Sequence, residues 1–352
     1  MGEECENAIG KMLYRIKIKY FLMKNGSSAE KMLIILDEKS EKARKLVKQT
    51  ILEEKLSQEK INQAIEQYIS RWNDTTRPGT LALSCEAAGG EIDKTVPLQT
   101  ALLLIDATMD IHDDIIDESL AKRNIKTIYG RLGKQAALLI GDAFIVKGFS
   151  QLHKAIENLP QERQNLIMNE INNFLLEVVD AHIIEAELKA RKWSLKPETY
   201  LQVLTKKAAD IDGHMKVGAI FGGGSPSDVE ILSKFGRNIG LLLVIRAEFI
   251  DLFESDELTN RVKNECLPLP ILYAIQNKTC KRKIKKILTK DKINNEDCAI
   301  ILEIVDNSLE VSILKKYLQK IAGDSIQILN NINKSQARSD LKTFATSLLE
   351  NI

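Results

Sequence analysis

The chain is poor in the residues that build disulfide frameworks and zinc sites. Its 352 residues include only 5 cysteines, an odd number, and these lie far apart without a Cys-x-x-Cys pair. We therefore expect neither a disulfide scaffold nor a zinc site, and a cytoplasmic protein. Long apolar runs are also absent: no stretch is long enough to span a bilayer, and the start MGEECENAIGK is too polar for a secretory signal.

An excess of charge of one sign is absent as well. Lys and Arg total 50, Asp and Glu total 49, and the formal net charge is +1. We expect no nucleic-acid partner, because this balance creates no general field that attracts polyanions. The basic run CKRKIKKILTK keeps Ile284, Ile287 and Leu288 at helical spacing, which indicates the solvated face of a helix.

Helix breakers are scarce, with 7 prolines and 18 glycines in the chain. Apolar residues recur at i, i+3, i+4 and i+7, so we predict an all-α fold, a helical bundle forming a single domain over residues 1–352. Capping boxes at Ser27 with Glu30 and at Ser227 with Glu230 mark two helix starts. We place further breaks near Pro78, Gly89, Gly90, Pro97, Gly130, Pro160, Pro197, residues 222–224 and residues 267–270.

One expected helix is unusually acidic. In LLLIDATMDIHDDIIDESLAKR (residues 102–123), an apolar stripe runs beside a stripe of aspartates at positions 106, 110, 113, 114 and 117. Lys and Arg are absent from Leu98 to Ala121, so the aspartates repel one another unless cations come from elsewhere or the face is solvated. Carboxylates without nitrogen or sulfur ligands suit Mg²⁺, which commonly bridges to phosphate oxygens, and Lys122 and Arg123 could bind further phosphate oxygens.

The segments HDDIID, LAKRNIKT and GKQAALLIGDAF resemble the trans-isoprenyl diphosphate synthases, the polyprenyl synthetase family, from about Arg77 to Pro270. The resemblance implies an isoprenoid-synthase-type helical bundle around a central apolar cavity. It implies a prenyltransferase of isoprenoid biosynthesis in which two or three Mg²⁺ ions clamp an allylic prenyl diphosphate and trigger its ionisation. It also implies a homodimer, or a hetero-oligomer with another synthase subunit.

The resemblance assigns roles on the side of the allylic donor. Asp113, Asp114 and Asp117 fill the first aspartate-rich motif as metal ligands, with Asp113 and Asp117 the direct ones. In the second motif Ala247 replaces the first aspartate, which leaves Glu248 and Asp251 as expected ligands. The residues expected to bind the diphosphate are Lys122, Arg123, Lys206 and Arg261. Lys206 matches the lysine of the family's Lys-Thr motif and is also expected to be catalytic.

The acceptor side departs from the family. Of the family's basic motif, the segment WNDTTRP keeps only Arg77 and Pro78, and Arg77 is expected to bind a diphosphate. At another position of the acceptor side, Asp106 replaces a histidine. Each lost charge-assisted bond removes about 1.5–3 kcal/mol, so we expect isopentenyl diphosphate to bind poorly in the usual pose. Thr108 stands where short-chain members carry a bulky aromatic residue, so we expect it to set product length and to admit a longer prenyl chain.

Two alternatives stay open. In a class I terpene synthase, water or the substrate's own double bond captures the cation, with Asp106 as a candidate base, although 5% aromatic residues give few rings to stabilise a cation. A regulatory subunit of a synthase is disfavoured because the DDIID motif is complete. The histidines, among them His112 and His182, are expected in packing or surface roles. Lys207 is expected either as a surface charge or as a charge directly behind the residues that contact the substrate.

Overall fold

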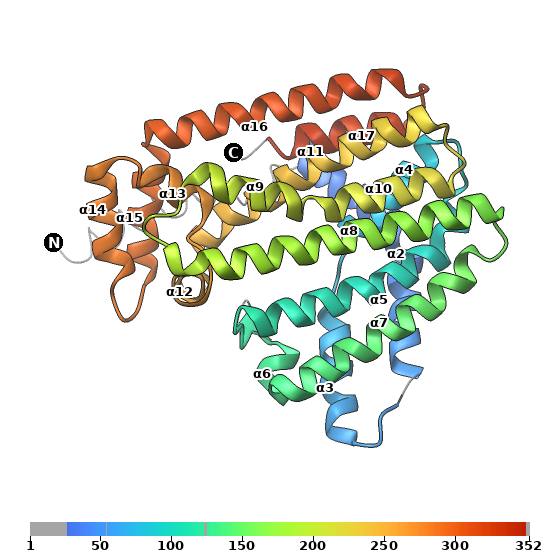
Figure 1. Cartoon of the computed structure of the whole chain (residues 1–352), viewed down its shortest axis with the longest axis horizontal. Coiled ribbons are helices and arrows are strands. Elements are labelled where there is room, and N and C mark those ends of the chain that lie inside the picture. Colours follow the sequence, from blue (N-terminus) through green and yellow to red (C-terminus); the bar gives the residue numbers. More distant parts are fainter. Residues whose placement is uncertain (1–26, 54, 123–124, 350–352) are drawn as a thin grey trace.

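The computed structural model describes residues 27–53, 55–122 and 125–349, so Arg123 lies outside the described residues. Helices dominate this part of the chain, as predicted (Figure 1). The α-helices are α2 (Ser28–Glu53), α3 (Glu59–Arg71), α4 (Thr76–Ala87), α5 (Ile92–Ile116), α6 (Ile128–Leu132), α7 (Lys134–Ile156), α8 (Gln161–Leu188), α9 (Pro197–Lys207), α10 (Ala209–Phe221), α11 (Pro226–Ile250), α12 (Ser255–Asn264), α13 (Leu269–Ala274), α14 (Lys278–Leu288), α15 (Asn295–Asp306), α16 (Leu309–Ile328) and α17 (Gln336–Ser347). Short 3₁₀ helices η1 (Lys189–Arg191), η2 (Asp251–Phe253) and η3 (Leu329–Asn331) follow α8, α11 and α16.

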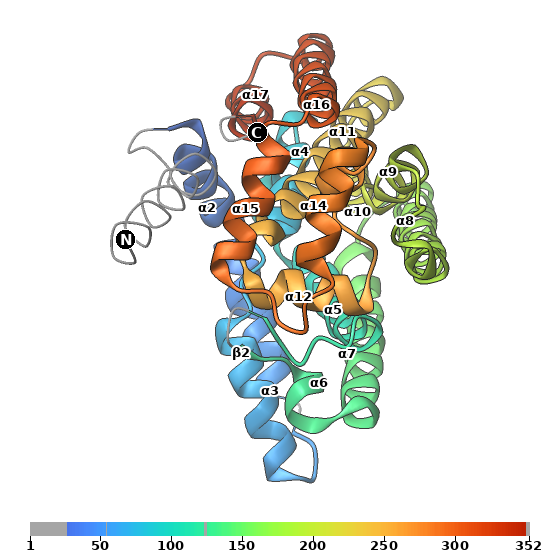
Figure 2. The same cartoon turned by 90° about the vertical axis from the view of Figure 1, so that its left-hand side faces the viewer.

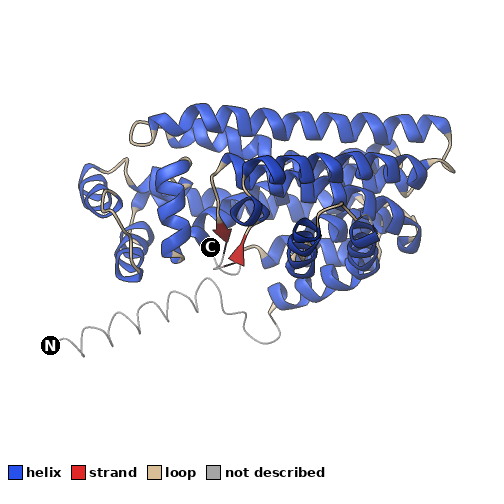
Figure 3. Ribbon diagram, turned by 90° about the horizontal axis from the view of Figure 1, so that it is seen from below, coloured by secondary structure: helices blue, strands red, loops and turns tan. Residues whose placement is uncertain are grey.

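A small antiparallel ribbon follows α5. Strands β1 (Ala121–Lys122) and β2 (Ile125–Lys126) pair Ala121 with Lys126 and Lys122 with Ile125, and they are the only strands in the described residues (Figure 3). The turn that enters the ribbon passes through Glu118, whose φ is 52°. The ribbon returns Lys122 toward the carboxyl end of α5, where the aspartates lie.

The central helices are α4, α5, α8, α10 and α11, and other helices cover them. In Figure 1, α16 and α17 run along the top of the molecule, and α14 and α15 stand at one end. The end-on view in Figure 2 shows α3 and α6 below the central helices and α16 and α17 above them. Helix α5 packs along α7, and α10 packs against α4, α8 and α11.

The packing of α10 on α4 requires a glycine. A Cβ atom at Gly218 would lie 2.3 Å from the carbonyl oxygen of Leu81, so only glycine lets the two backbones come this close. Buried apolar residues of α4, α5, α8 and α10, such as Leu81, Leu102 and Phe174, join in one core cluster at this junction. The close approach places residues at the start of α4 beside residues at the start of α10.

Two predicted helix boundaries are wrong. Pro97 lies inside α5, near its beginning, where a proline removes one helical hydrogen bond without ending the helix. Helix α11 is capped by Ser225 with Asp228, not by Ser227 with Glu230, because Pro226 takes the first helical position. The predicted cap at Ser27 is confirmed, since its Oγ accepts the backbone N–H of Glu30 at 3.1 Å.

In the described part of the chain, no helix is sufficiently long and apolar to traverse a bilayer.

Candidate active site

The aspartates of the first motif lie at the carboxyl end of α5. Asp114 is 5% exposed, and its Oδ1 lies 2.7 Å from Lys122 Nζ on β1. Lys122 Nζ also lies 3.7 Å from Asp113 Oδ2. Asp114, predicted as a metal ligand with the other two aspartates, therefore forms the shorter of these two pairs with Lys122.

Two further side chains lie close to Asp113, the cation Lys207 and His182, whose pKa burial and the Lys207 charge lower from its usual value. His182 Nδ1 on α8 lies 3.4 Å from Asp113 Oδ1. Lys207, the last residue of α9, forms an ion pair with Glu185 and lines the same cavity as Asp113. Burial raises the pKa of Asp113, but Lys122, Lys207 and His182 outweigh burial and hold this pKa below its usual range. Asp113 is thus a carboxylate among cations.

Asp117 is in the opposite situation. Burial raises its pKa to about 9, and the charges of Asp113 and Glu265 contribute to the rise. Asp117 lies one helical turn from Asp113, and a divalent cation would neutralise the negative charge of the two carboxylates together. A set of oxygen ligands of this kind suits Mg²⁺. Asp113 and Asp117 therefore fit a metal ion.

The structure places the neighbouring residues Lys206 and Lys207 on different faces of α9. Lys206 Nζ donates to Asp180 Oδ2 at 2.7 Å, and both side chains are substantially exposed on the outer surface of α8 and α9. Lys207 faces the cavity instead. Consecutive helical residues differ by about 100° in direction, so only one of the pair can face inward.

A cavity of about 180 Å³ adjoins Asp113. Its apolar wall comes from α5, α8 and α11, through Met109, Phe174, Leu175, Val178 and Val244. The hydroxyl of Thr108, the residue predicted to set product length, donates to the Gly141 carbonyl of α7 at 2.9 Å and so faces the neighbouring helix. Met109, the next residue along α5, is the side chain at the cavity wall.

The far side of the cavity is acidic. Arg77 on α4 lies amid four aspartates: its Nε is 2.7 Å from Asp210 Oδ2, and its Nη1 is 2.8 Å from Asp74 Oδ2. Arg77 also lies 3.5 Å from Asp110 Oδ1 and 3.9 Å from Asp106 Oδ1. The guanidinium, which the family resemblance predicts to bind a diphosphate, is thus engaged by protein carboxylates in this structure.

His214 completes this acidic cluster. It is 1% exposed, with Nε2 3.2 Å from Asp106 Oδ2 and Nδ1 3.3 Å from Asp210 Oδ1. Burial lowers the pKa of His214, but Asp106 and Asp210 outweigh burial and raise it well above its usual value. These three side chains lie close enough together to hold a metal ion. However, a protonated His214 and Arg77 already supply positive charge, so the trio does not fit a metal.

The residues of the second motif pair with Arg261. Arg261 Nη2 lies 2.5 Å from Glu248 Oε1, and Nη1 lies 2.7 Å from Asp251 Oδ2. Arg261 is 7% exposed and Glu248 3% exposed. The structure thus pairs the two expected metal ligands, Glu248 and Asp251, with Arg261, the expected diphosphate-binding group.

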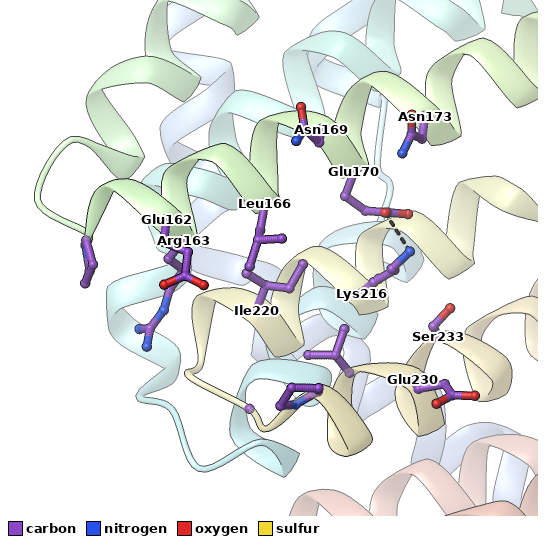
Figure 4. Close-up of a pocket in the computed structure, with 14 residues that line it drawn as sticks. Glu162, Arg163, Leu166, Asn169, Glu170, Asn173, Lys216, Ile220, Glu230 and Ser233 are labelled. Carbon is purple, nitrogen blue, oxygen red and sulfur yellow. Dashed lines mark ion pairs between the residues drawn. The ribbon is translucent and has the colours of Figure 1, made fainter.

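A second hollow lies between α8, α10 and α11 (Figure 4). Its volume is about 780 Å³, its floor includes Leu166 and Ile220, and a 2.7 Å ion pair joins Lys216 to Glu170. Two neighbouring residues of α8 line different cavities: Asn173 lines this second hollow, and Phe174 lines the central cavity beside Asp113. We place the chemistry in the central cavity, because that cavity contains Asp113 and Lys207.

Sequence reasoning missed Lys207, His182, His214 and Asp210 as site residues. One signal was available for Lys207 and His182: both lie close in sequence to residues at which the family resemblance already predicts the site. Asp210 and His214 stand at i and i+4 on α10, a spacing that places them on one helical face. Their partner Asp106 is far away in sequence, so no local pattern reveals the cluster.

Comparisons with known proteins identify the family and the fold of the chain. Residues 58–305 match the family model described as Polyprenyl synthetase. A short chain isoprenyl diphosphate synthase of Methanothermobacter thermautotrophicus is 25% identical over 326 residues, which cover 90% of this chain and 97% of that protein. The crystal structure of geranylgeranyl pyrophosphate synthetase from Pyrococcus horikoshii superposes with a TM-score of 0.77 at 21% identity, covering 91% of this chain and 98% of that one.

A second solved structure adds ligands to the comparison. Geranylgeranyl pyrophosphate synthase from Corynebacterium glutamicum, complexed with isoprenyl diphosphate and magnesium, superposes with a TM-score of 0.76 at 18% identity. The superposition covers 92% of this chain and 99% of that one. The predicted isoprenoid-synthase-type bundle is therefore confirmed.

Proposed function

Because the chain belongs to the polyprenyl synthetase family and is a trans-prenyltransferase, we propose that it ionises an allylic prenyl diphosphate beside Asp113 and transfers the prenyl group. The observation that carries this proposal is the arrangement around the central cavity. Asp113, Lys207 and His182 line its charged side, while apolar residues of α5, α8 and α11 line the wall beside them. Such a site can hold a diphosphate at one edge and an isoprenoid chain against the apolar wall.

The charged groups have separate roles in this proposal. Asp113 and Asp117 would hold Mg²⁺, which would supply Lewis-acid stabilisation of the negative charge on the leaving diphosphate. Lys122 and Lys207 donate hydrogen bonds to diphosphate oxygens and stabilise the charge that develops as the allylic carbon–oxygen bond breaks. Met109, Phe174 and Val178 exclude water from the allylic cation.

The acceptor binds, in this proposal, near Arg77. The four aspartates around Arg77 repel a second diphosphate, so isopentenyl diphosphate binds weakly and elongation requires a high acceptor concentration. Asp106 is the candidate base that receives the proton lost after carbon–carbon bond formation. Burial raises the pKa of Asp106 to about 6, which suits proton transfer near neutral pH.

We propose a homodimer that joins through α7 and α8. These helices lie along one side of the molecule, at the right in Figure 2. Leu139, Val146 and Phe149 on α7 are 68%, 70% and 38% exposed, and Leu176 and Ile183 on α8 are 59% and 55% exposed. An apolar face of this kind is typical of a subunit interface. Sedimentation should show a dimer for the native chain and monomers for Val146→Glu, and a monomeric native chain would refute the assembly.

The experiment that tests the proposed function measures release of pyrophosphate from allylic diphosphates in the presence of Mg²⁺. We expect release to require Mg²⁺ and to fall by orders of magnitude in Asp113→Asn/Asp117→Asn. Glu230→Gln serves as the matched control, because Glu230 pairs with Lys234 on the surface and not in the cavity. Release that persists in the double variant would contradict the assignment.

A further inference from the structure

Glu248 has protein donors at both of its carboxylate oxygens. Oε1 accepts a hydrogen bond from Arg261 Nη2 at 2.5 Å, and the Tyr200 hydroxyl lies 3.1 Å from the same oxygen. Oε2 accepts the backbone N–H of Leu269 at 2.7 Å. A metal ion could bind Glu248 only if these bonds were broken in a buried setting, where an unpaired donor is costly.

Arg261 occupies the position that a cation would need. Its three guanidinium nitrogens face three carboxylates: Glu248, Asp251 at 2.7 Å and Glu265 at 3.5 Å. A divalent ion beside Asp251 would lie against this fixed positive charge, and repulsion at such distances is strong inside a protein. Ala247, the exposed neighbour of Glu248, has no ligand atom in its side chain.

The cluster continues from Arg261 toward the first motif. The Tyr200 hydroxyl on α9 lies 3.1 Å from Arg261 Nη2 and 2.6 Å from Glu185 Oε1. Glu185 Oε2 in turn pairs with Lys207, which lines the same cavity as Asp113. Tyr200 is fully buried, so its hydroxyl is fixed by packing as well as by these bonds.

We propose, resting on the function proposed above, that the second motif of this enzyme binds no metal and that Arg261 replaces an ion there as a built-in cation. Arg261 is then a positioning residue. Through Glu248, Tyr200 and Glu185 it fixes Lys207, and the Lys207 ammonium supplies charge to the diphosphate on the side where an ion is missing. Metal binding is confined to Asp113 and Asp117.

The first test counts the Mn²⁺ ions bound per full-length chain in the presence of inorganic pyrophosphate, by calorimetry and electron paramagnetic resonance. We expect Glu248→Gln to bind as many ions as the native chain and Asp113→Asn to bind fewer. Should Glu248→Gln fail to fold, Asp251→Asn, at a more accessible position, provides the same comparison.

The second test addresses the positioning of Lys207. In Tyr200→Phe, which removes only the hydroxyl, the dissociation constant of pyrophosphate should rise by about two- to tenfold while the Mn²⁺ count stays unchanged. Tyr317→Phe is the matched control, because it makes the same chemical change at a tyrosine on α16 that is 41% exposed. We expect this control to leave both quantities at their native values.

Each outcome separates this inference from the proposed function. A lower ion count in Glu248→Gln would show that Glu248 is a ligand and would overturn the metal-free second motif. An ion count that Asp113→Asn leaves unchanged, or a native chain that binds no Mn²⁺, would instead overturn the metal site of the proposed function. An unchanged pyrophosphate affinity in Tyr200→Phe would refute the positioning of Lys207 through Tyr200.

Discussion

Exchange of Lys207 for methionine tests which of two consecutive lysines serves the diphosphate. Lys207 lines the cavity that contains Asp113, whereas Lys206 pairs with Asp180 on the outer surface. A hydrogen bond from an ammonium to a diphosphate oxygen contributes about 1.5–3 kcal/mol, which corresponds to about ten- to 150-fold in rate. We expect Lys207→Met to lower kcat/KM for the allylic diphosphate by this factor, and Lys206→Met to change it by no more than about twofold, because exposed ion pairs contribute little.

The assay is steady-state release of pyrophosphate from the allylic diphosphate at saturating Mg²⁺. Removal of Lys207 also leaves the buried Glu185 without its ion-pair partner, so folding must be checked by denaturant unfolding. The double variant Lys207→Met/Glu185→Gln removes both charges and should recover stability without recovering kcat/KM. A larger loss in Lys206→Met than in Lys207→Met would refute the orientation of α9 on which the reasoning depends.

Three further predictions concern the cavity. Asp74→Asn should lower the KM for isopentenyl diphosphate several-fold in initial-rate assays, because it removes a negative charge 2.8 Å from Arg77; an unchanged KM would contradict repulsion at the acceptor side. Phe174→Ala should lengthen the products seen by mass spectrometry, because it removes an aromatic ring from the cavity wall; an unchanged product length would exclude Phe174 as a limit. His214→Gln should reduce the free energy of unfolding most at pH 6, and progressively less as the pH rises above the usual histidine pKa of about 6.5. The reason is that His214, whose pKa is raised in the folded state, stabilises the fold only while its imidazole is protonated. A loss that grows with pH would contradict this sign.

The fold could be predicted because its signals are local. Helical periodicity, few prolines and the cap at Ser27 each depend on residues within one or two turns of one another. The exceptions are also local: Pro97 occupies an early turn of α5 that tolerates it, and Pro226 moves the cap of α11 to Ser225. Local chemistry therefore accounts for both the agreement and the errors in the helix boundaries.

The candidate site could be predicted only in part. The positions of Asp113, Asp117 and Lys122 follow from one helix and the ribbon that returns along it. The orientation of Lys207 depends on a buried partner, Glu185, from another helix. Pairings between distant segments are set by packing, so the sequence motif alone could not reveal which charged groups remain free for substrate.

The engagement of Arg77 and Arg261 by carboxylates shows the same limit. Each arginine stands where the family resemblance predicts a diphosphate-binding group, and each is paired instead with aspartates or glutamates. In both cases partners come from another helix, α10 for Arg77 and α11 for Arg261. An alignment of motifs identifies the residue type, whereas the surrounding charges decide its role.

The most direct test of the central claim is mass spectrometry of the products formed from Mg²⁺, an allylic diphosphate and isopentenyl diphosphate at increasing concentration. We predict longer prenyl diphosphates that appear only at high isopentenyl diphosphate concentration and disappear in Asp113→Asn/Asp117→Asn. A hydrocarbon or alcohol formed equally well without isopentenyl diphosphate, above the control without enzyme, would contradict prenyl transfer to an acceptor and indicate terpene synthase chemistry instead.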